Sequence, residues 1–420
     1  MAKRTAKRPT GRKTSGQGQT LAQTGAVMQG LFFKIYRSQS IYFYQLLGVT
    51  LFLVIFGLVM VLSASSIDSL KASNNSFAIF NKQALVAILG LVAMSIASIL
   101  PMDFWRNRWA RFFFVGSLGL QVLVIFIGAD INGNRNWIRI AGVAIQPSEF
   151  LKIFVVLHVA AFLAARKRDF DDPKTWYRAF AIMAIAMGLV IVGKDLGTVI
   201  IMFIMFVSLL SLAGLPMKLL RTLILLSIAS LPILLNVGSG SRVGRITAWM
   251  NPSAPDPNGY NWQSEHGMWA ISAGRIFGAG LGESKMKWSW IPEVENDFIF
   301  AVISEELGLI GALVVIALFV FMAITFFRIW QRTADDMSRY VVSGVMVWII
   351  FQALINIAVV LRLLPVLGVP LPLISAGGSS LLTTLGAIGI VLAVERENHA
   401  NPLSGRQGRM PAARPVRRVR

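Results

Sequence analysis

The chain has 420 residues, of which 55% are hydrophobic and only 14% are charged, and its mean hydropathy is +0.65. A soluble domain carries about 25% charged residues, so this composition indicates a membrane protein. The chain contains no cysteine and three scattered histidines, which excludes disulfides and thiolate nucleophiles and argues against a metal site rich in these residues. The net charge of +20 lies between apolar segments and at the two ends, as the positive-inside rule predicts for a membrane protein.

The first 40 residues are basic, rich in Gly, Ser and Thr, and lack the apolar core of a cleavable signal. We expect residues 1–40 to be a disordered cytoplasmic tail lying near anionic lipid. Residues 396–420 are rich in arginine and are expected to form a second cytoplasmic tail. Tails of this kind commonly fix topology, so no nucleic-acid partner is predicted.

Residues 41–395 are predicted to form one transmembrane domain, because a membrane span needs about 20 mostly apolar residues. Ten segments qualify: 42–63, 79–100, 110–129, 148–165, 178–193, 196–214, 217–237, 297–327, 340–361 and 373–394. The predicted fold is therefore an all-α polytopic membrane protein with ten transmembrane helices. An even number places both tails on one face, which then holds 28 of the 40 Lys and Arg residues, so both termini are predicted to be cytoplasmic.

This topology places residues 238–296 outside the membrane, as one long extracytoplasmic loop between the seventh and eighth spans. Connections longer than about 15 residues are usually functional or disordered. The segment is rich in Trp and Gly without low-complexity sequence, so we expect short interfacial helices and turns at the level of the lipid headgroups.

Ionisable residues within the predicted spans are candidates for function, because charge at membrane depth is costly. In "QPSEFLK", Glu149 and Lys152 are three residues apart on one helical face. The pair is either an internal salt bridge or part of a polar cavity that opens outward. Lys194 and Asp195, in "GKDLGT", lie at the hinge between the fifth and sixth spans, and Arg362 closes the ninth span on the same outer side.

The segment "SAGGSS", from Ser375 to Ser380, opens the tenth span. Amides at a helix N-terminus bind anions, although a Gly-Ser entry is equally consistent with close helix packing.

The stretch "IPEVENDFIFAVISEELGLIG" holds five of the 20 acidic residues of the chain. Asp297 lies at the outer mouth of the eighth span, where it either caps the helix or faces an outer cavity. Glu305 lies about 12 Å deeper at 1.5 Å per residue, and Glu306 is turned about 180° from Asp297. We therefore expect the acids not to form one cluster, with Glu305 and Glu306 making interhelical contacts.

Five motifs together resemble the SEDS family (shape, elongation, division and sporulation): "QPSEFLK", "DLGT", "GAGLGESKMKWSWIPE", "NDFIFAVISEELGLIG" and "LPVLGVPLPLISAGGSS". The resemblance covers every predicted span and leaves out only the tails. It is closer to the cell-division branch than to the elongation branch. The chain departs from the family pattern at Gly193 and Lys194, where Gln-Pro is usual, and at Ala376, where an aromatic residue is usual.

The resemblance implies a peptidoglycan glycosyltransferase that polymerises lipid II at the outer face of the bacterial cytoplasmic membrane, at the division septum. It implies a class B penicillin-binding transpeptidase and other divisome proteins as partners, and Asp297 as the catalytic residue.

The residue types present are consistent with the reaction that the resemblance implies. Joining an α-linked diphosphate donor into a β-1,4 link inverts C1, which requires a base for the acceptor hydroxyl and cations for the departing diphosphate. We expect partial burial, Glu293 and Glu295 to raise the pKa of Asp297. No motif requires a cofactor or metal, although Mg²⁺ or Mn²⁺ could assist. The candidate residues for binding substrate or diphosphate are Lys152, Glu149, Lys194, Asp195, Arg245, Lys287, Glu293, Ser375 and Ser379.

Two other classes of protein compete with this interpretation. A lipid II flippase would use the buried charges as a translocation path. The long outer loop argues against a flippase, because it concentrates polar residues on one face whereas alternating access needs two. A scaffold that only recruits the transpeptidase would leave the buried charges without a purpose.

Overall fold

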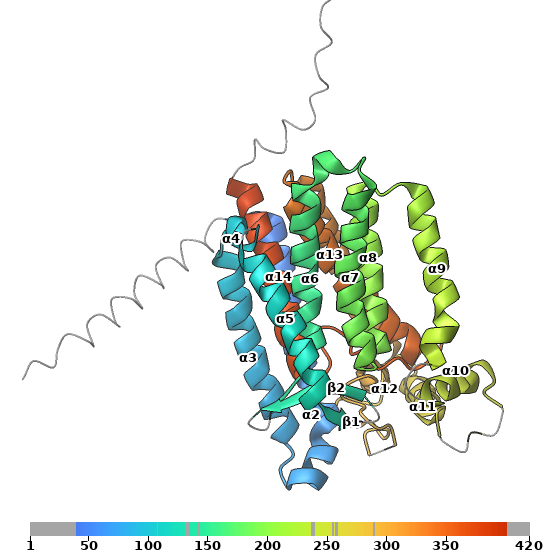
Figure 1. The fold of residues 1–420 in the computed structure, drawn as a ribbon. Coiled ribbons are helices and arrows are strands. Elements are labelled where there is room, and N and C mark those ends of the chain that lie inside the picture. The colour runs from blue at the N-terminus through green and yellow to red at the C-terminus, as the bar shows by residue number, and fades with distance from the viewer. Residues whose placement is uncertain are drawn as a thin grey trace, which may run out of the picture.

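The computed structural model describes residues 39–400, except residues 107, 132–133, 141–142, 237–239, 254–255, 257–258 and 289. Long helices lie side by side in a bundle, with the shorter elements gathered at its two ends (Figure 1). Nine helices in this part of the chain are long and apolar enough to cross a membrane: α2 (Ile41–Ser73), α3 (Ala78–Ile99), α5 (Arg108–Ile127), α6 (Pro147–Ala165), α7 (Pro173–Val192), α8 (Leu196–Ala213), α12 (Ile299–Arg332), α13 (Asp336–Val360) and α14 (Gly378–Ala400). The prediction of a polytopic, mainly helical membrane protein is thus confirmed.

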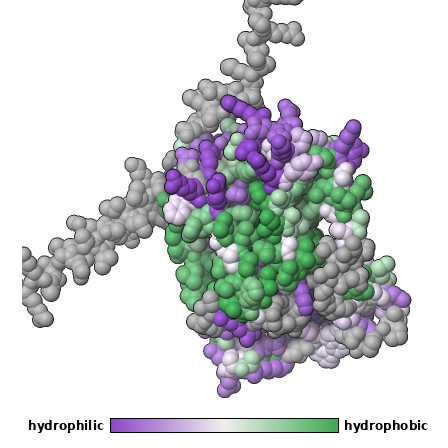
Figure 2. Space-filling model, in the orientation of Figure 1, coloured by the Kyte–Doolittle hydropathy of each residue, from purple (hydrophilic) through white to green (hydrophobic). Residues whose placement is uncertain are grey.

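Helix α9 (Met217–Asn236) occupies the seventh predicted span and contacts α8 at the edge of the bundle, although it is not among those nine (Figure 1). On the face shown in Figure 2, an apolar belt lies between polar residues above and below it. The most deeply buried helices are α13 and α14, so the core lies around them.

Both ends of the described chain lie on the same face of the bundle. Ser40, which caps the N-terminus of α2, donates a hydrogen bond from its hydroxyl to the buried carboxylate of Glu395 near the end of α14. Arg396 donates to the carbonyls of Ser98 and Ile99, where α3 ends. This face also carries α4 (Met102–Arg106) and the short 3₁₀ helix η1 (Lys167–Asp169) (Figure 1). Residues 1–38 and 401–420 of the two predicted tails lie outside the described residues.

A small antiparallel sheet departs from the all-α prediction. Its strands β1 (Ala129–Ile131), β2 (Asn134–Ile140) and β3 (Val143–Ile145) follow one another in chain order between α5 and α6. In the second pair, Ile138 lies opposite Ile145 and Ile140 opposite Val143. Strands this short lack the periodic pattern that would identify them, and the alternating "NWIRI" run is the one signal for them in the sequence.

The segment 238–296, called the outer loop after its predicted position, contains short helices in its described part. Helix α10 (Gly240–Met250) and helix α11 (Trp262–Gly274) lie at the end of the bundle opposite to the chain ends, and turns continue from there to α12 (Figure 1).

Helix α12 is interrupted at Gly308, where φ is +68° and ψ is −167°. The loop after α11 enters this break and completes its hydrogen bonds. The amides of Ala279 and Gly280 donate to the carbonyls of Glu305 and Glu306. The amides of Leu309 and Ile310 donate to the carbonyls of the two residues that follow α11, Arg275 and Ile276. Non-helical backbone at membrane depth is tolerated where protein satisfies it in this way. A Cβ at position 308 would lie 2.4 Å from the Gly278 amide nitrogen, which requires glycine.

Candidate functional site

Asp297 lies two residues before the start of α12, in a backbone arrangement held by residues far away in the sequence. The side-chain amide of Asn356 on α13 donates to the carbonyls of Asp297 and Val369, both at 2.8 Å. The Ser375 hydroxyl donates to the carbonyl of Asn296 at 2.5 Å. The segment before α12 is thereby fixed to the segment before α14, which positions the Asp297 carboxylate.

The Asp297 side chain does not cap α12. The N-cap residue is Phe298, and no side chain caps that end of the helix. Among the described residues, no hydrogen-bond donor is recorded for the Asp297 carboxylate. Oδ2 lies against Gly368, at 3.7 Å from where a Cβ on that residue would be. The carboxylate is therefore partly buried without a hydrogen-bond partner in the described chain, and the capping interpretation of Asp297 is wrong.

Burial raises the pKa of Asp297 from 3.8 to about 7. The negative charge of Glu293 adds to this effect, as do those of Asp195 and Glu295, whereas Arg245 on α10 opposes it. Burial also raises the pKa of Glu295, with a contribution from Glu293. A carboxylate with a pKa near the ambient pH is well matched to general-base catalysis, because it combines an ionised population with proton affinity.

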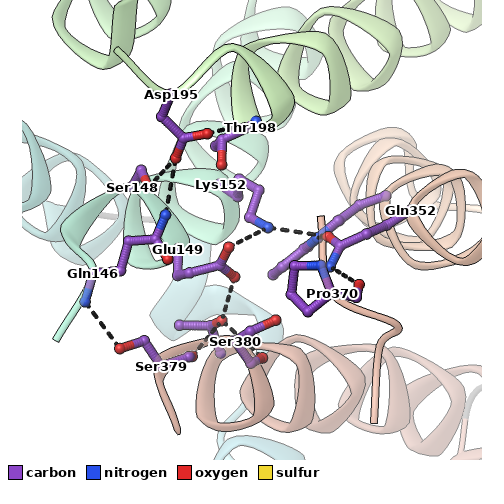
Figure 3. A network of polar contacts seen from close by, with 12 residues as sticks. Gln146, Ser148, Glu149, Lys152, Asp195, Thr198, Gln352, Pro370, Ser379 and Ser380 are labelled. Atoms are coloured by element: carbon purple, nitrogen blue, oxygen red, sulfur yellow. Dashed lines mark hydrogen bonds and ion pairs between the residues drawn. The ribbon is translucent and has the colours of Figure 1, made fainter. Parts of the chain in front are cut away.

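Asp195 lies at the N-terminus of α8 and organises a polar network (Figure 3). One carboxylate oxygen accepts a hydrogen bond from the amide of Thr198 at 3.0 Å and so caps the helix. The other accepts from the side chains of Gln146 at 2.9 Å and Ser148 at 3.3 Å. Lys194 precedes it with φ at +65°, a conformation that few residues other than glycine adopt.

Glu149 and Lys152 form an internal salt bridge of 2.8 Å, with side chains only 4% and 2% exposed. The Lys152 ammonium also donates to Gln352 at 3.1 Å and lies 4.7 Å from the centre of the Trp348 ring. This arrangement ties α6 to α13 (Figure 3). Thr383 on α14 contacts the second oxygen of Glu149 at 3.5 Å. The sequence left open whether this pair is an internal salt bridge or part of a polar cavity, and the structure shows the internal salt bridge.

The hydroxyls at the entry to α14 are used within the protein. Ser379 accepts a hydrogen bond from the amide of Gln146 at 2.9 Å, and Ser375 both accepts from the Leu371 amide and donates to Asn296. These contacts favour close packing as the purpose of the "SAGGSS" entry. They also join this entry to the start of α6 and to the segment that carries Asp297.

Lys287 lies in a different, buried cluster. Its ammonium is 3.4 Å from Glu306 and also donates to the carbonyl of Gly282. Glu306 accepts from Ser63 on α2 at 2.6 Å, which is an interhelical contact of the predicted kind, and Glu305 accepts from the amide of Lys285 at 2.9 Å. The cluster fastens the outer loop to α12 and α2.

The structure thus brings Asp297 together with Glu293, Asp195, Arg245 and Ser375, and it separates Lys287 from them. Glu149 and Lys152 pair with each other in a buried salt bridge. The sequence interpretation missed Asn356, whose only signal is an amide within a span that is otherwise apolar. Among the described residues, no group of three or more His, Asp or Glu side chains is placed to hold a metal ion.

Comparison with known proteins shows the family. The FtsW/RodA/SpoVE profile, described as "Cell cycle protein", matches residues 44–400. The probable peptidoglycan glycosyltransferase FtsW of Mycobacterium tuberculosis is 37% identical over 369 residues, which cover 87% of this chain and 70% of that protein. The stage V sporulation protein E of Bacillus subtilis is 35% identical and covers 83% of this chain and 95% of that protein.

Solved structures show the same fold. A chain from a study entitled "Structural coordination of polymerization and crosslinking by a peptidoglycan synthase complex" aligns with a TM-score of 0.68 at 24% identity, covering 86% of this chain and 99% of that chain. The rod shape determining protein RodA of Thermus thermophilus aligns with a TM-score of 0.64 at 24% identity, covering 87% and 99%. The fold is that of a polytopic membrane protein, with the Asp297 carboxylate just before α12 at the end of the bundle that carries α10 and α11. This chain belongs to the FtsW/RodA/SpoVE family, which is the SEDS family.

Proposed function

We propose that this protein is a peptidoglycan glycosyltransferase that polymerises lipid II into glycan strands at the outer face of the bacterial cytoplasmic membrane during cell division. Relatives at 34 to 37% identity are named as FtsW glycosyltransferases, which supports the activity and the cell-division branch. The observation that carries the proposal is the Asp297 carboxylate, which is partly buried, lacks a hydrogen-bond partner among the described residues and has a pKa raised to about 7.

The proposed reaction is a single displacement. Asp297 accepts the proton of the acceptor sugar's 4-hydroxyl while that oxygen attacks C1 of the lipid-linked donor. The bond between C1 and the diphosphate oxygen breaks, C1 is inverted, and polyprenyl diphosphate leaves with the bonding electrons. Arg245 carries a positive charge that acts on Asp297, and in this proposal it stabilises the negative charge that develops on the leaving group.

The proposal includes ten transmembrane helices, with α9 as the seventh, and cytoplasmic termini that carry the basic tails 1–40 and 396–420. The contact between Ser40 and Glu395 supports an even number of crossings. We also propose a location at the division septum, with a class B penicillin-binding transpeptidase and other divisome proteins as partners. A solved relative whose title concerns a peptidoglycan synthase complex supports such a partnership.

The test is the Asp297→Asn variant of the purified full-length chain, supplied with lipid II and its transpeptidase partner. We expect glycan synthesis to fall by roughly 10²- to 10⁴-fold, the usual contribution of a positioned base. Asp103→Asn is the matched control, because its carboxylate is exposed on the face that holds the chain ends. Glycan chains made at the normal rate by Asp297→Asn would refute the assignment.

The alternative function, a lipid II flippase, requires charges that alternate between the two faces. The buried and mutually satisfied Glu149–Lys152 pair argues against such a path. Translocation of lipid II across liposomes that persists in Asp297→Asn without polymerisation would favour the flippase.

A further inference from the structure

The turn that follows α13 contains an arginine in an unfavourable backbone conformation. Arg362 has φ at +59°, in the left-handed region where a residue other than glycine is uncommon. Such conformations typically cost about 1–3 kcal/mol and cluster at functional sites, where the surrounding structure holds them in place. An arginine in a conformation that favours glycine therefore suggests a functional role for its guanidinium group.

That guanidinium is incompletely satisfied. Its Nε and one terminal nitrogen are buried without a hydrogen-bond partner in the described part of the chain. The acid that pairs with it is Glu265 on α11, at 3.9 Å, which is too long for a hydrogen bond. The Glu265 side chain is 38% exposed and that of Arg362 is 24% exposed. A buried donor without an acceptor is costly, so the position favours an additional anion.

The surroundings connect Arg362 to Asp297. The indole nitrogen of Trp249 on α10 donates to the carbonyl of Arg362 at 2.9 Å, which holds the turn against that helix. Arg245 precedes Trp249 by four residues, so both lie on the same face of α10. The charge of Arg245 acts on Asp297, and Gly368, six residues after Arg362, lies against the Asp297 carboxylate.

We propose that Arg362 and Arg245 form an anion subsite that binds the diphosphate of the lipid-linked substrate, and that Glu265 occupies this subsite when the substrate is absent. The inference rests on the proposed function and deepens it. A guanidinium presents a planar fork of donors that fits phosphate oxygens, which supply more acceptor atoms and more charge than one carboxylate. Because Glu265 is the more exposed partner, its displacement uncovers Arg362 for the incoming diphosphate.

The experiment measures binding by the purified full-length chain in detergent micelles, using undecaprenyl diphosphate, undecaprenol and inorganic pyrophosphate as probes. The informative variant is Arg362→Gly, because glycine adopts φ near +60° without strain and the fold should survive. We expect its affinity for undecaprenyl diphosphate to fall roughly ten- to a hundredfold, the range for losing a charge-assisted hydrogen bond, with an unchanged or higher unfolding temperature. Undecaprenol affinity should not change.

Arg275→Gly is the matched control. It makes the same substitution at another arginine of positive φ, +48°, which is exposed and lies about 15 Å along α11 from Glu265 at 1.5 Å per residue. We expect no change in diphosphate affinity. The Glu265→Gln variant should have the opposite effect to Arg362→Gly and bind undecaprenyl diphosphate a few-fold more tightly, because it removes the competing carboxylate.

Equal diphosphate affinity in wild type and Arg362→Gly would overturn the proposal, as would weaker binding in Glu265→Gln. Inorganic pyrophosphate that binds with the same dependence on Arg362 would identify free diphosphate as a ligand as well. The outcome is separable from that for Asp297, because Asp297→Asn should keep its diphosphate affinity. Loss of binding in Arg362→Gly alongside active Asp297→Asn would refute the assigned base and leave the subsite standing.

Discussion

In the acidic stretch 291–311, Asp297 of the outer part is eight and nine residues from Glu305 and Glu306 of the inner part, and the surroundings of these carboxylates differ. In the inner part, Glu305 and Glu306 are buried, and their carboxylates accept hydrogen bonds from Ser63, from the loop amides and from the Lys287 ammonium. In the outer part, the backbone around Asp297 is held by Asn356 and Ser375, while its carboxylate has no such partner in the described residues.

One short segment of sequence thus supplies both structural carboxylates, Glu305 and Glu306, and the proposed catalytic carboxylate, Asp297. The Glu305 carboxylate and one oxygen of Glu306 accept hydrogen bonds, and these contacts hold the outer loop against α12 and α2. A carboxylate that is partly desolvated next to like charges retains a proton at higher pH, and this makes it basic enough to accept one from a substrate. The contacts of Glu305 and Glu306 thus hold the structure around the site, while the Asp297 carboxylate remains available to accept a proton.

The largest effect should come from breaking the inner cluster. In Lys287→Met, the carboxylate of Glu306 loses its buried counter-ion, and we expect the free energy of unfolding to fall by about 3–5 kcal/mol. The double variant Lys287→Met with Glu306→Gln should recover much of this loss, because no uncompensated charge remains. Thermal unfolding in detergent micelles measures both.

Lys285→Met is the control for Lys287→Met, since Lys285 is exposed two residues away and should change stability by less than about 0.5 kcal/mol. Lys287 was also predicted from the sequence to bind diphosphate. A Lys287→Met variant that keeps wild-type stability but loses diphosphate affinity would favour that role over the structural one.

The next effect is a gain of stability when the outer charge is removed. The pKa of Asp297 is about 7 in the folded protein and about 3.8 when unfolded, so the folded state holds the proton more tightly between these values. Stability is therefore lost as pH rises from about 4 to 7. Asp297→Asn should be more stable than wild type by about 2–4 kcal/mol at pH 8, and the difference should vanish near pH 4.

Unfolding temperatures of the wild type and Asp297→Asn across this pH range test the prediction. A difference that is independent of pH would mean that the Asp297 carboxylate is not desolvated in the folded protein. The expected result, an inactive variant more stable than its parent, is the usual sign of a residue kept for activity at the expense of stability.

Much of this arrangement follows from the sequence, because spans are local. Runs of about 20 apolar residues predict the helices, and the long loop with its short helices follows from the topology they impose. The position of Asp297 at the mouth of α12 follows from the same count. The strands within residues 129–145 were not predicted, because strands of three residues are too short to show the alternating pattern that identifies a strand.

Contacts between distant segments could not be predicted from spacing. Asn356 is 59 residues from Asp297, and Ser375 is 79 residues from Asn296, so nothing local indicates that either one fixes the backbone of the site. The break of α12 at Gly308 could not be predicted from the sequence either. The sequence offers two glycines near the acids, but only the packing of the loop 274–280 against α12 shows that one of them interrupts the helix.

The smallest effect concerns the tuning of Asp297 by its neighbour. The negative charge of Glu293 raises the pKa of Asp297, second only to burial, so Glu293→Gln should lower that pKa. A general base acts only when it is ionised, and the rate of lipid II polymerisation in wild type should rise with pH and level off above about pH 7. In Glu293→Gln, we expect the midpoint of this rise to move to lower pH by up to about one unit.

The matched control for that shift is Glu283→Gln, an exposed acid of the same outer loop that does not contribute to the pKa of Asp297. Its midpoint should match that of wild type. A midpoint that stays in place in Glu293→Gln would mean that burial alone sets the basicity of Asp297. A rate independent of pH between 5 and 8 would mean that the proton of the acceptor hydroxyl goes elsewhere, which removes the chemical distinction between the two parts of the stretch.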